Sequence, residues 1–393
     1  MTIIGGGVMG LMTAYYAAPL AEAVTVLERS WVGDPATASF GLTRSVRNDY
    51  RDPEYSRLAF EARRLWLAFQ EQSSEPLLVD CGCLNLAKAS VTPDLNSTYA
   101  AQSFAVLEQL QLRREVFSAA DLQQRFPQFS ADRGWLDVDA GFADVAAVTR
   151  ALRRALRIRG VRVAENSVLR GIDRSARAWR VTSESGPVDS DVLVITAGLG
   201  TNDVLELVPG CSVRFPVRPD RPVQSKYFIP PARTRSLFTE TALPVFAYLD
   251  IGIYGHPLYE GKTPGVKIGF YNPPDAALVA SRIRGVEDFV AECMPGLCGA
   301  EVVDVADATG VDGCPYDLVA DDDFILGPVP GVEDVFTGAG WRGTGYKFAP
   351  WVGLVLAQLA LQQGTGYDIR RFAPTRFAGQ HAASEHAAGG VAS

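Results

Sequence analysis

The sequence lacks the features of membrane, nucleic-acid-binding and secreted proteins. No apolar run reaches the roughly 20 residues that a membrane-spanning helix needs, and no basic segment opens the chain as in a signal peptide. The formal net charge of -8 argues against a polyanionic partner, which a basic stripe would normally bind. The arginines between Arg150 and Arg159 indicate instead the solvated face of one helix. We therefore expect a protein that binds neither a membrane nor nucleic acid.

Cysteine is scarce as well. Six cysteines occur in 393 residues, without the spacing of a disulfide framework or a metal cluster. Cys81 and Cys83 are two residues apart in CGCLNLA, so strand alternation places them on one face and favours a buried pair over a metal site. We therefore expect no metal and a reducing, cytoplasmic environment.

Glycine, in contrast, is concentrated at the start of the chain, in MTIIGGGVMGLM. We interpret Thr2–Ile4 as a short strand and Val8–Ala18 as an apolar helix, joined by a tight turn. Gly5, Gly7 and Gly10 then form the Gly-x-Gly-x-x-Gly fingerprint of a dinucleotide-binding turn. Because so few residues precede the turn, we expect either a stunted first strand or a misassigned start codon. The alternative for the glycines is a turn that only packs.

The second strand supports the dinucleotide interpretation. The apolar segment Ala23–Leu27 ends at Glu28, near the place of the carboxylate that hydrogen-bonds an adenosine ribose. An acid there disfavours NADP, because it would repel a 2′-phosphate. We assign Glu28 and the adjacent Arg29 to the cofactor site. We also assign Val8 and Met9, because the first backbone amides of the helix can donate hydrogen bonds to the phosphates.

Two further glycine turns point to the identity of the dinucleotide. Gly198 follows an apolar strand, Asp191–Thr196, and TGAGWRGTGYKFAP follows a strand that ends in Phe336 and precedes the apolar helix Trp351–Leu361. Three turns that converge on one cofactor suit a long, extended dinucleotide, which favours FAD over NAD. In the last turn we assign to the cofactor Gly340, Gly343, Thr344, Gly345, Tyr346 and Lys347.

The chain resembles the monomeric sarcosine oxidase and N-methyltryptophan oxidase family of flavin amine oxidases, which includes the imino-acid oxidase of nikkomycin biosynthesis. The resemblance runs from the first glycine turn to about Arg371. The motifs that carry it are GGGVMG with Glu28, LTRSVRNDY, KIGF, GCPYD followed by DDDFILGPVPG, and GAGWRGTGYKFAPWVG. Their order along the chain is more specific than any one of them.

This resemblance implies an α/β architecture: a Rossmann-like FAD-binding domain of the glutathione-reductase type, interleaved with a mixed β-sheet substrate domain. We expect the FAD domain in residues 1–85, 140–212 and 305–375, and the substrate domain in residues 86–139 and 213–304. The resemblance also implies that the protein is a monomer. The small polar tail, residues 376–393, is predicted to be disordered.

The resemblance also implies a covalent flavin. Cys314 lies in a Gly-Cys-Pro turn, a poor place for a core thiol. The matching family cysteine carries FAD through a thioether to the 8-methyl group of the ring. The alternative for Cys314 is a buried free thiol.

Two basic residues are candidates for binding a substrate carboxylate. Lys347 lies between apolar residues and needs an anionic partner to keep its charge, and Arg47 offers a guanidinium that can bind a carboxylate with two hydrogen bonds. Alone, either would more often form a surface ion pair. The resemblance implies that both bind the substrate, which is then an amino acid with a free carboxylate.

A third basic residue, Lys267, lies inside the apolar strand Val266–Phe270. Alternation alone favours a strand-edge lysine. The resemblance implies instead a lysine beside the flavin whose positive charge promotes the reaction of the reduced cofactor with O2.

The remaining candidates line the substrate pocket by resemblance. Tyr254 and Tyr316 match tyrosines of the family site, and Arg44 matches an arginine close to the flavin. The family histidine after the KIGF strand is replaced by Tyr271, which argues against sarcosine as the substrate; His256 is a candidate to compensate, although a lone loop histidine is more often structural.

The size of the substrate is indicated by Trp341, in the loop where sarcosine oxidases carry a smaller aromatic ring. The bulkier ring favours a flat or cyclic substrate. We predict an FAD-dependent oxidase of a secondary-amine amino acid that forms an imine and H2O2, with natural-product biosynthesis as one setting. The alternatives are a dehydrogenase that passes electrons to another carrier and a flavin-binding protein without turnover.

Overall fold

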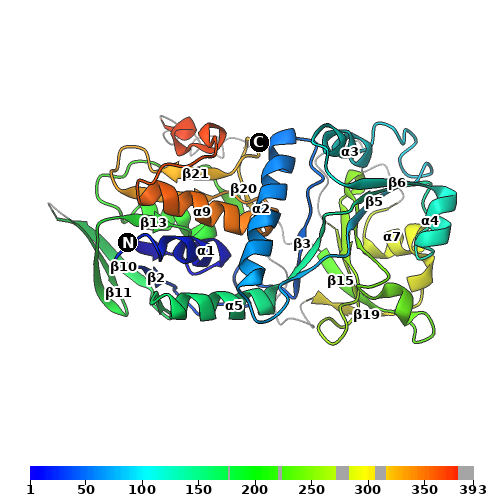
Figure 1. The fold of residues 1–393 in the computed structure, drawn as a ribbon, viewed down its shortest axis with the longest axis horizontal. Coiled ribbons are helices and arrows are strands. Elements are labelled where there is room, and N and C mark those ends of the chain that lie inside the picture. The colour runs from blue at the N-terminus through cyan, green and yellow to red at the C-terminus, as the bar shows by residue number, and fades with distance from the viewer. Residues whose placement is uncertain (176–177, 220–223, 271–282, 306–315, 379–393) are drawn as a thin grey trace, which may run out of the picture. The chain divides into compact units, whose positions relative to one another are not determined.

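The structure is a computed structural model that describes residues 1–175, 178–219, 224–270, 283–305 and 316–378 (Figure 1). Each of its two compact units is assembled from separate stretches of chain. The first unit contains residues 1–34, 152–220 and 316–393, and the second contains residues 35–151 and 221–315. Among the described residues, no helix has both the length and the apolar character that crossing a bilayer requires.

The first unit is built on a six-stranded sheet with strand order β21-β22-β13-β1-β2-β9. The five strands from β22 to β9 run parallel, and β21 pairs antiparallel at one edge. Their bounds are Thr2–Ile4 (β1), Thr25–Leu27 (β2), Arg162–Ala164 (β9), Leu193–Ile195 (β13), Ile325–Pro328 (β21) and Val335–Ala339 (β22).

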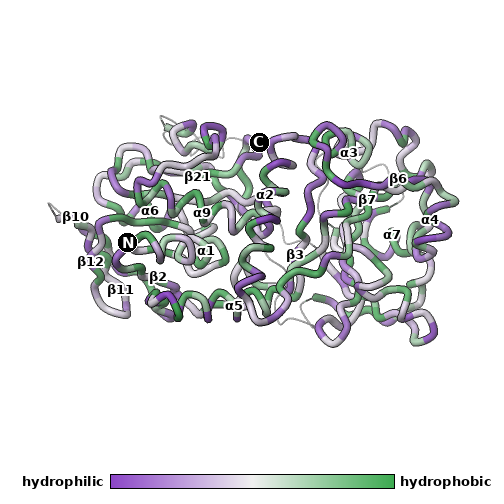
Figure 2. Tube along the Cα trace, in the orientation of Figure 1, coloured by the Kyte–Doolittle hydropathy of each residue, from purple (hydrophilic) through white to green (hydrophobic). Residues whose placement is uncertain are grey.

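Two apolar helices, α1 (Val8–Ala17) and α9 (Ala349–Ala360), lie side by side over one face of this sheet (Figure 1). Figure 2 shows that α9 is hydrophobic along most of its length. Both helices are buried on nearly every side because each packs against the sheet and against its neighbour. The contact is close at Gly353, where a β-carbon would lie 2.5 Å from the backbone carbonyl carbon of Met12.

The opposite face of the sheet carries a second apolar core. Ile4, Leu193 and Ile195 pack there against Trp179 and Val181 of a small antiparallel sheet. That sheet contains β10 (Leu169–Arg174), β11 (Trp179–Ser183) and β12 (Gly186–Ser190). The unit is completed by α6 (Thr201–Leu205) and by the short pair β14 (Arg218–Pro219) and β20 (Asp317–Leu318).

The second unit is built on an eight-stranded mixed sheet with strand order β19-β15-β18-β17-β16-β5-β7-β6. All neighbouring strands pair antiparallel except β16 and β5, which pair parallel. Their bounds are Cys83–Ala87 (β5), Arg114–Ser118 (β6), Arg133–Asp137 (β7), Gln224–Ile229 (β15), Val245–Tyr248 (β16), Ile253–His256 (β17), Val266–Phe270 (β18) and Glu301–Asp304 (β19).

A smaller sheet of this unit carries the arginine segment. Its strands are β3 (Thr43–Val46), β4 (Leu78–Val79) and β8 (Gly141–Asp144), in the order β3-β8-β4. The helices of the unit are α2 (Pro53–Glu71), α3 (Tyr99–Gln109), α4 (Ala119–Arg125) and α7 (Val286–Cys293), and α5 (Val145–Ile158) contains a unit boundary. Asp52 caps α2 by accepting hydrogen bonds from the amides of Glu54 and Tyr55.

The predicted α/β class is confirmed, and the predicted elements agree with the observed ones to within a few residues. The strand predicted at Val266–Phe270 is β18 without change, whereas Asp191–Thr196 shortens to Leu193–Ile195. The bounds of the compact units differ from those of the predicted domains, since residues 35–85 and 140–151 belong to the second unit. The functional division into an FAD domain and a substrate domain stays a prediction. The predicted tail lies, from residue 379 onward, outside the described residues.

The packing of α1 on α9 predicts that Gly353→Ala destabilises the protein. The added methyl group would collide with backbone atoms of α1, and overpacking of this kind costs about 2 kcal/mol, more than the gain in helix propensity. Urea unfolding measures the loss. Gly366→Ala is the control, because its β-carbon would meet no atom within 4 Å. Equal stability of the two variants would contradict the packing argument.

Candidate functional site

The turn after β1 is closed so tightly that two of its glycines are required. Gly5 has φ +109°, a conformation that other residues rarely adopt. A β-carbon on Gly10 would lie 2.0 Å from the Gly5 carbonyl oxygen and 2.7 Å from Oγ1 of Thr196. The third glycine therefore allows α1 to begin directly against the end of the strand, as the fingerprint predicts.

Glu28 lies directly over this turn. Its carboxylate accepts hydrogen bonds from the amides of Gly6, at 2.7 Å, and Ser30, at 2.9 Å, and its side chain is buried. Gly6 has to be a glycine as well, because a β-carbon there would lie 2.8 Å from Cβ of Glu28. Arg29, the neighbour that we predicted as a cofactor residue, is exposed.

The N-terminus of α1 fits an anionic group. Gly7 occupies the N-cap position without a side chain that could cap the helix, and the first turn contains no acidic residue. The amides of the first turn, including those of Val8 and Met9, point out of this helix end and suit the binding of an anion, although the two side chains are buried in the core.

The three predicted glycine turns lie at one edge of the sheet. β13 pairs in parallel with both β1 and β22, with Ile195 opposite Ile4 and opposite Thr337. The turns that leave these strands therefore emerge side by side at the carboxyl end, where open α/β sheets bind ligands. Gly198 has φ +58° and Gly340 has φ +74°, so both turns use conformations that favour glycine.

The last of these turns is organised by Asp317, a residue to which the sequence analysis assigned no role. Its carboxylate accepts a hydrogen bond from the amide of Gly340, at 3.0 Å. Burial raises the pKa of Asp317, although several backbone amides work in the opposite direction. The preceding residue, Tyr316, lies with its ring over Gly343, where a β-carbon would come within 2.3 Å of the ring.

Trp341, which we predicted as a pocket wall, packs within the same turn. Its ring lies edge-on to Phe324, with centroids 5.3 Å apart, and a β-carbon on Gly345 would lie 2.5 Å from its Cβ. The side chain is 9% exposed, so most of its surface supports the loop. Its contact with a substrate stays a prediction.

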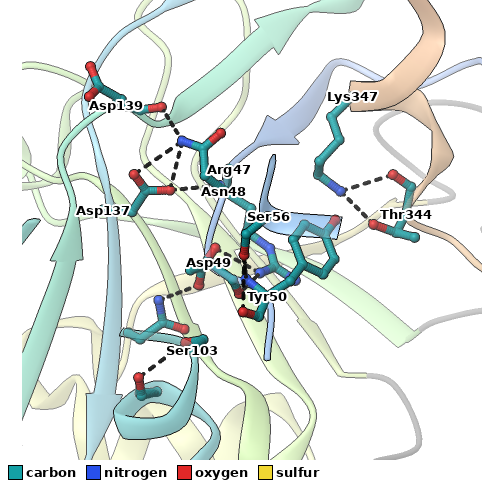
Figure 3. A network of polar contacts seen from close by, with 12 residues as sticks. Arg47, Asn48, Asp49, Tyr50, Ser56, Ser103, Asp137, Asp139, Thr344 and Lys347 are labelled. Carbon is teal, nitrogen blue, oxygen red and sulfur yellow. Dashed lines mark hydrogen bonds and ion pairs between the residues drawn. The ribbon is translucent and has the colours of Figure 1, made fainter. Parts of the chain in front are cut away.

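Lys347 is buried at the start of α9. Its ammonium group donates to the carbonyl oxygen of Thr344, at 2.9 Å, and to the hydroxyl of the same residue, at 2.7 Å (Figure 3). Tyr346, between the two, is half-buried. Both acceptors are neutral, so these two contacts hold the ammonium in place without cancelling its charge.

Together these features fit FAD in the first unit. The uncapped helix N-terminus suits the pyrophosphate, Glu28 suits the adenosine ribose, and the neighbouring turns suit a ligand that extends across the sheet edge.

In the second unit, β3 and the segment after it carry the two predicted arginines. Arg44 donates to the carbonyl oxygens of Phe40 and Ala38. Arg47 forms an ion pair with Asp49, at 2.7 Å between Nη1 and Oδ1, and its guanidinium carbon lies 4.8 Å from the centroid of the Tyr50 ring. Burial is the largest single effect and lowers the pKa of Arg47, but the Asp49 carboxylate and the nearby Tyr50, Tyr99 and Cys83 together raise it well above the ordinary value.

A buried polar network continues from this ion pair (Figure 3). The backbone amide of Asn48 donates to Asp137 at 2.7 Å, and its side-chain amide donates to the Asp139 carbonyl oxygen at 2.7 Å. Burial, and next the charge of Asp49, raise the pKa of Asp137 to about 7. No role was predicted for Asp49, Asp137 or Asp139. The only sequence signal was RNDY, in which Asn48 and Asp49 follow Arg47.

His256 lies on strand β17, and the expectation of a loop histidine was wrong. Its ring is buried between two hydroxyl groups of β3, with Nδ1 2.7 Å from Oγ1 of Thr43 and Nε2 2.8 Å from Oγ of Ser45. Burial, and then the positive charges of Lys267 and Arg44, hold the pKa of His256 well below its usual value. The imidazole is therefore neutral, with one nitrogen as donor and the other as acceptor.

Lys267 shares a sheet face with His256 and Tyr254. His256 lies opposite Lys267 in the register of β17 and β18, and Tyr254 lies two residues along. The Lys267 ammonium is 5.7 Å from the centroid of the Tyr254 ring. Burial lowers the pKa of Lys267. Burial raises the pKa of Tyr254, but the charge of Lys267, a hydrogen bond with Ser225 and the charge of Arg44 together outweigh burial, so the pKa of Tyr254 is lowered. The strand-edge alternative for Lys267 does not apply, since β18 lies between β15 and β17.

Two predicted residues, Cys314 and Tyr271, lie outside the described residues. Within the described part of the chain, no group of three or more His, Cys, Asp or Glu side chains could hold a metal ion. The five cysteines described there are free.

The neutral state of His256 predicts a pH-dependent stability. Because its pKa in the folded protein is below the unfolded value of about 6.5, protonation opposes folding and stability falls as the pH drops below that value. One such proton changes the free energy of unfolding by at most about 1.4 kcal/mol per pH unit. His256→Gln should be less sensitive than the wild type to a shift from pH 7.5 to pH 5.5 in urea unfolding. Parallel losses in both proteins would contradict the assignment.

Comparison with known proteins agrees with this arrangement. The family model "FAD dependent oxidoreductase" matches residues 1–359. The chain is 26% identical over 401 residues to human peroxisomal sarcosine oxidase, covering 95% of each chain, and 25% identical over 390 residues to N-methyl-L-tryptophan oxidase of Yersinia pestis, covering 96% of this chain and 99% of the relative.

Solved structures share the fold. L-proline dehydrogenase from P. horikoshii aligns with a TM-score of 0.78 at 20% identity, covering 96% of this chain and 97% of its own. NikD, an amino acid oxidase of nikkomycin biosynthesis, aligns with a TM-score of 0.74 at 23% identity, covering 95% and 96%. Since the family model spans most of the chain and the glycine turns, Glu28 and the helix N-terminus fit the cofactor, the chain belongs to the FAD-dependent oxidoreductases, within which it is related to the sarcosine and N-methyltryptophan oxidases.

Proposed function

We propose that the protein is an oxidase of a secondary-amine amino acid, N-methylated or cyclic, which it converts to an imine while O2 is reduced to H2O2. The observation that carries the proposal is the buried Lys267 cation on β18, on a sheet face with Tyr254 and His256. Its relatives, a sarcosine oxidase and an N-methyl-L-tryptophan oxidase, support the substrate class.

Bound FAD supplies the two-electron chemistry, accepting electrons from the carbon–nitrogen bond and passing them to O2. The residues that would hold it are, by sequence and by their place in the fold, Gly5, Gly7, Gly10, Glu28, Gly198, Gly340, Gly343, Thr344 and Gly345. Arg44, held by two backbone carbonyl groups, would lie close to the isoalloxazine ring.

Arg47 and Lys347 would bind the carboxylate of the substrate. Lys347 is buried and Arg47 is half-buried, and neighbouring residues hold both side chains. A guanidinium and an ammonium together suit a carboxylate better than either alone. Tyr254, Tyr316 and Trp341 would bound the amine and the carbon chain. The amine reacts in its unprotonated form.

The positive charge of Lys267 would stabilise the negative charge that develops on oxygen as O2 is reduced. Burial strengthens this effect, because a charge inside the protein is screened less than in water. The same burial lowers the pKa of Lys267, so the oxygen reaction would slow as the pH rises through that pKa.

A dehydrogenase is the second candidate, and the structural alignment with L-proline dehydrogenase favours it. In that case electrons leave to a carrier other than O2. The two candidates differ in the fate of the electrons, whereas their substrates belong to one class.

The covalent link to Cys314 completes the proposal and rests on the family resemblance. The GCPYD motif continues into Tyr316 and Asp317, which organise the last glycine turn, so the motif leads directly to the cofactor edge of the sheet. We further propose a monomer in a reducing, cytoplasmic compartment, which the five free cysteines support.

The first test measures peroxide. Under air, wild-type protein with an N-methyl or cyclic amino acid should form H2O2 in step with imine, and Lys267→Met should slow the reoxidation of the reduced protein by about 100-fold or more while anaerobic reduction by substrate is kept. Lys226→Met is the control, since this lysine lies on the neighbouring strand and pairs with Glu287 near the surface. Substrate-dependent dye reduction without peroxide would favour the dehydrogenase.

The second test addresses the cofactor linkage. After acid precipitation, the yellow colour should stay with the wild-type pellet and leave with the supernatant for Cys314→Ser. Cys298→Ser, which changes an exposed free thiol, should retain the colour. Release of the flavin from the wild type would remove the covalent assignment but leave FAD binding intact.

A further inference from the structure

The guanidinium of Arg47 is already engaged with an acid of its own chain. Its Nη1 donates to Oδ1 of Asp49, at 2.7 Å, and to the Asp49 backbone carbonyl oxygen, at 2.9 Å. The Asp49 side chain is 0% exposed and that of Arg47 is 15% exposed. A substrate carboxylate at Arg47 would therefore meet a cation that a buried carboxylate has partly neutralised.

Asp49 is fixed from its other side as well. The side-chain amide of Asn85, on β5, donates to Oδ2 of Asp49 at 2.6 Å, and Asn85 is itself buried. β5 lies inside the eight-stranded sheet, between β16 and β7. Both carboxylate oxygens are thus held, and Arg47 is tied through Asp49 to the rigid centre of the sheet.

The charge of Asp49 opposes that of an incoming carboxylate. Two unit charges a few ångströms apart in a protein site interact strongly enough to change a dissociation constant by a factor of ten or more. Asp49 also orders the guanidinium before the substrate arrives, which lowers the entropic cost of binding. Its two effects, fixing Arg47 and weakening its attraction for anions, are separable by substitution.

We propose that Asp49, anchored by Asn85, positions Arg47 and weakens the affinity of Arg47 for the carboxylate of the substrate. This inference rests on the proposed function, because it requires Arg47 to bind that carboxylate. It follows that the substrate draws much of its binding energy from the rest of its structure. A larger N-methylated or cyclic amino acid meets that requirement, and sarcosine, which has little beyond the carboxylate and the amine, does not.

The chain offers a nearly isosteric test, Asp49→Asn. The amide oxygen can still accept from Arg47. The new amide nitrogen replaces Oδ2, which accepts from Nδ2 of Asn85, so the Asn85 amide has to rotate and present its Oδ1, an atom that is buried without a hydrogen-bond partner among the described residues. The substitution removes the charge and keeps the packing. Asp137→Asn is the matched control. At pH 6 the Asp137 carboxyl, with a pKa of about 7, is mostly protonated, and it accepts hydrogen bonds from Asn48.

The experiment titrates the flavin-loaded protein at pH 6 with benzoate, a carboxylate without an oxidisable amine, and follows the flavin absorbance. Asp49→Asn should bind benzoate about tenfold more tightly than the wild type, with KM for the substrate lowered and kcat little raised, whereas Asp137→Asn should stay within twofold. Asp49→Ser replaces Asp49→Asn if the latter does not fold, and the same direction is expected. Unchanged or weaker binding in the Asp49 variant would overturn the proposal.

Arg47→Met separates this inference from the function on which it rests. A loss of benzoate affinity of about 100-fold in Arg47→Met, with no gain in Asp49→Asn, overturns the role of Asp49 alone. Unchanged affinity in Arg47→Met overturns both, because Arg47 then does not bind the carboxylate.

Discussion

The parallel pairing of β13 with both β1 and β22 is the constraint on which the cofactor site depends. These strands lie far apart in the sequence, and their in-register hydrogen bonds bring three glycine turns to one edge of one sheet. Each turn alone is a common local motif. Held side by side, with the uncapped N-terminus of α1 and the Glu28 carboxylate, they form an extended surface for a dinucleotide that reaches across several strands.

The second unit buries several charged or titratable side chains. Arg47, Asp49, Asp137, His256 and Lys267 are all buried or nearly so, and a buried charge needs a partner or has to be neutralised. Both pairing and neutralisation occur here. Arg47 pairs with Asp49, and His256 is held neutral between two hydroxyl groups. Burial, and next the charge of Asp49, raise the pKa of Asp137 to about 7. So many buried polar groups are costly for stability, which is typical of a functional site.

Much of the first unit could be predicted because its signals are local. Gly5 is needed for its backbone conformation, and Gly10 for the close contact between α1 and the end of β1. Glycines at these positions therefore predict the turn from the sequence alone. The apolar runs of α1, α9 and β18 are continuous because these elements are buried on all sides, and their bounds followed within a few residues. Asp317 was missed because its role is a hydrogen bond to a residue 23 positions away.

The sequence by itself determined the fold class, the dinucleotide and the candidate basic residues, since glycine spacing, apolar periodicity and motif order are properties of neighbours along the chain. Only the tertiary structure decided what those residues contact. Strand pairing set Lys267 opposite His256 on one sheet face, and the fold packed Asn85 of β5 against Asp49, two residues after Arg47. Such pairings join residues that are not neighbours in the sequence, 36 positions apart for Asn85 and Asp49, and leave no local pattern. The charge that Arg47 presents to a ligand therefore depends on the folded structure.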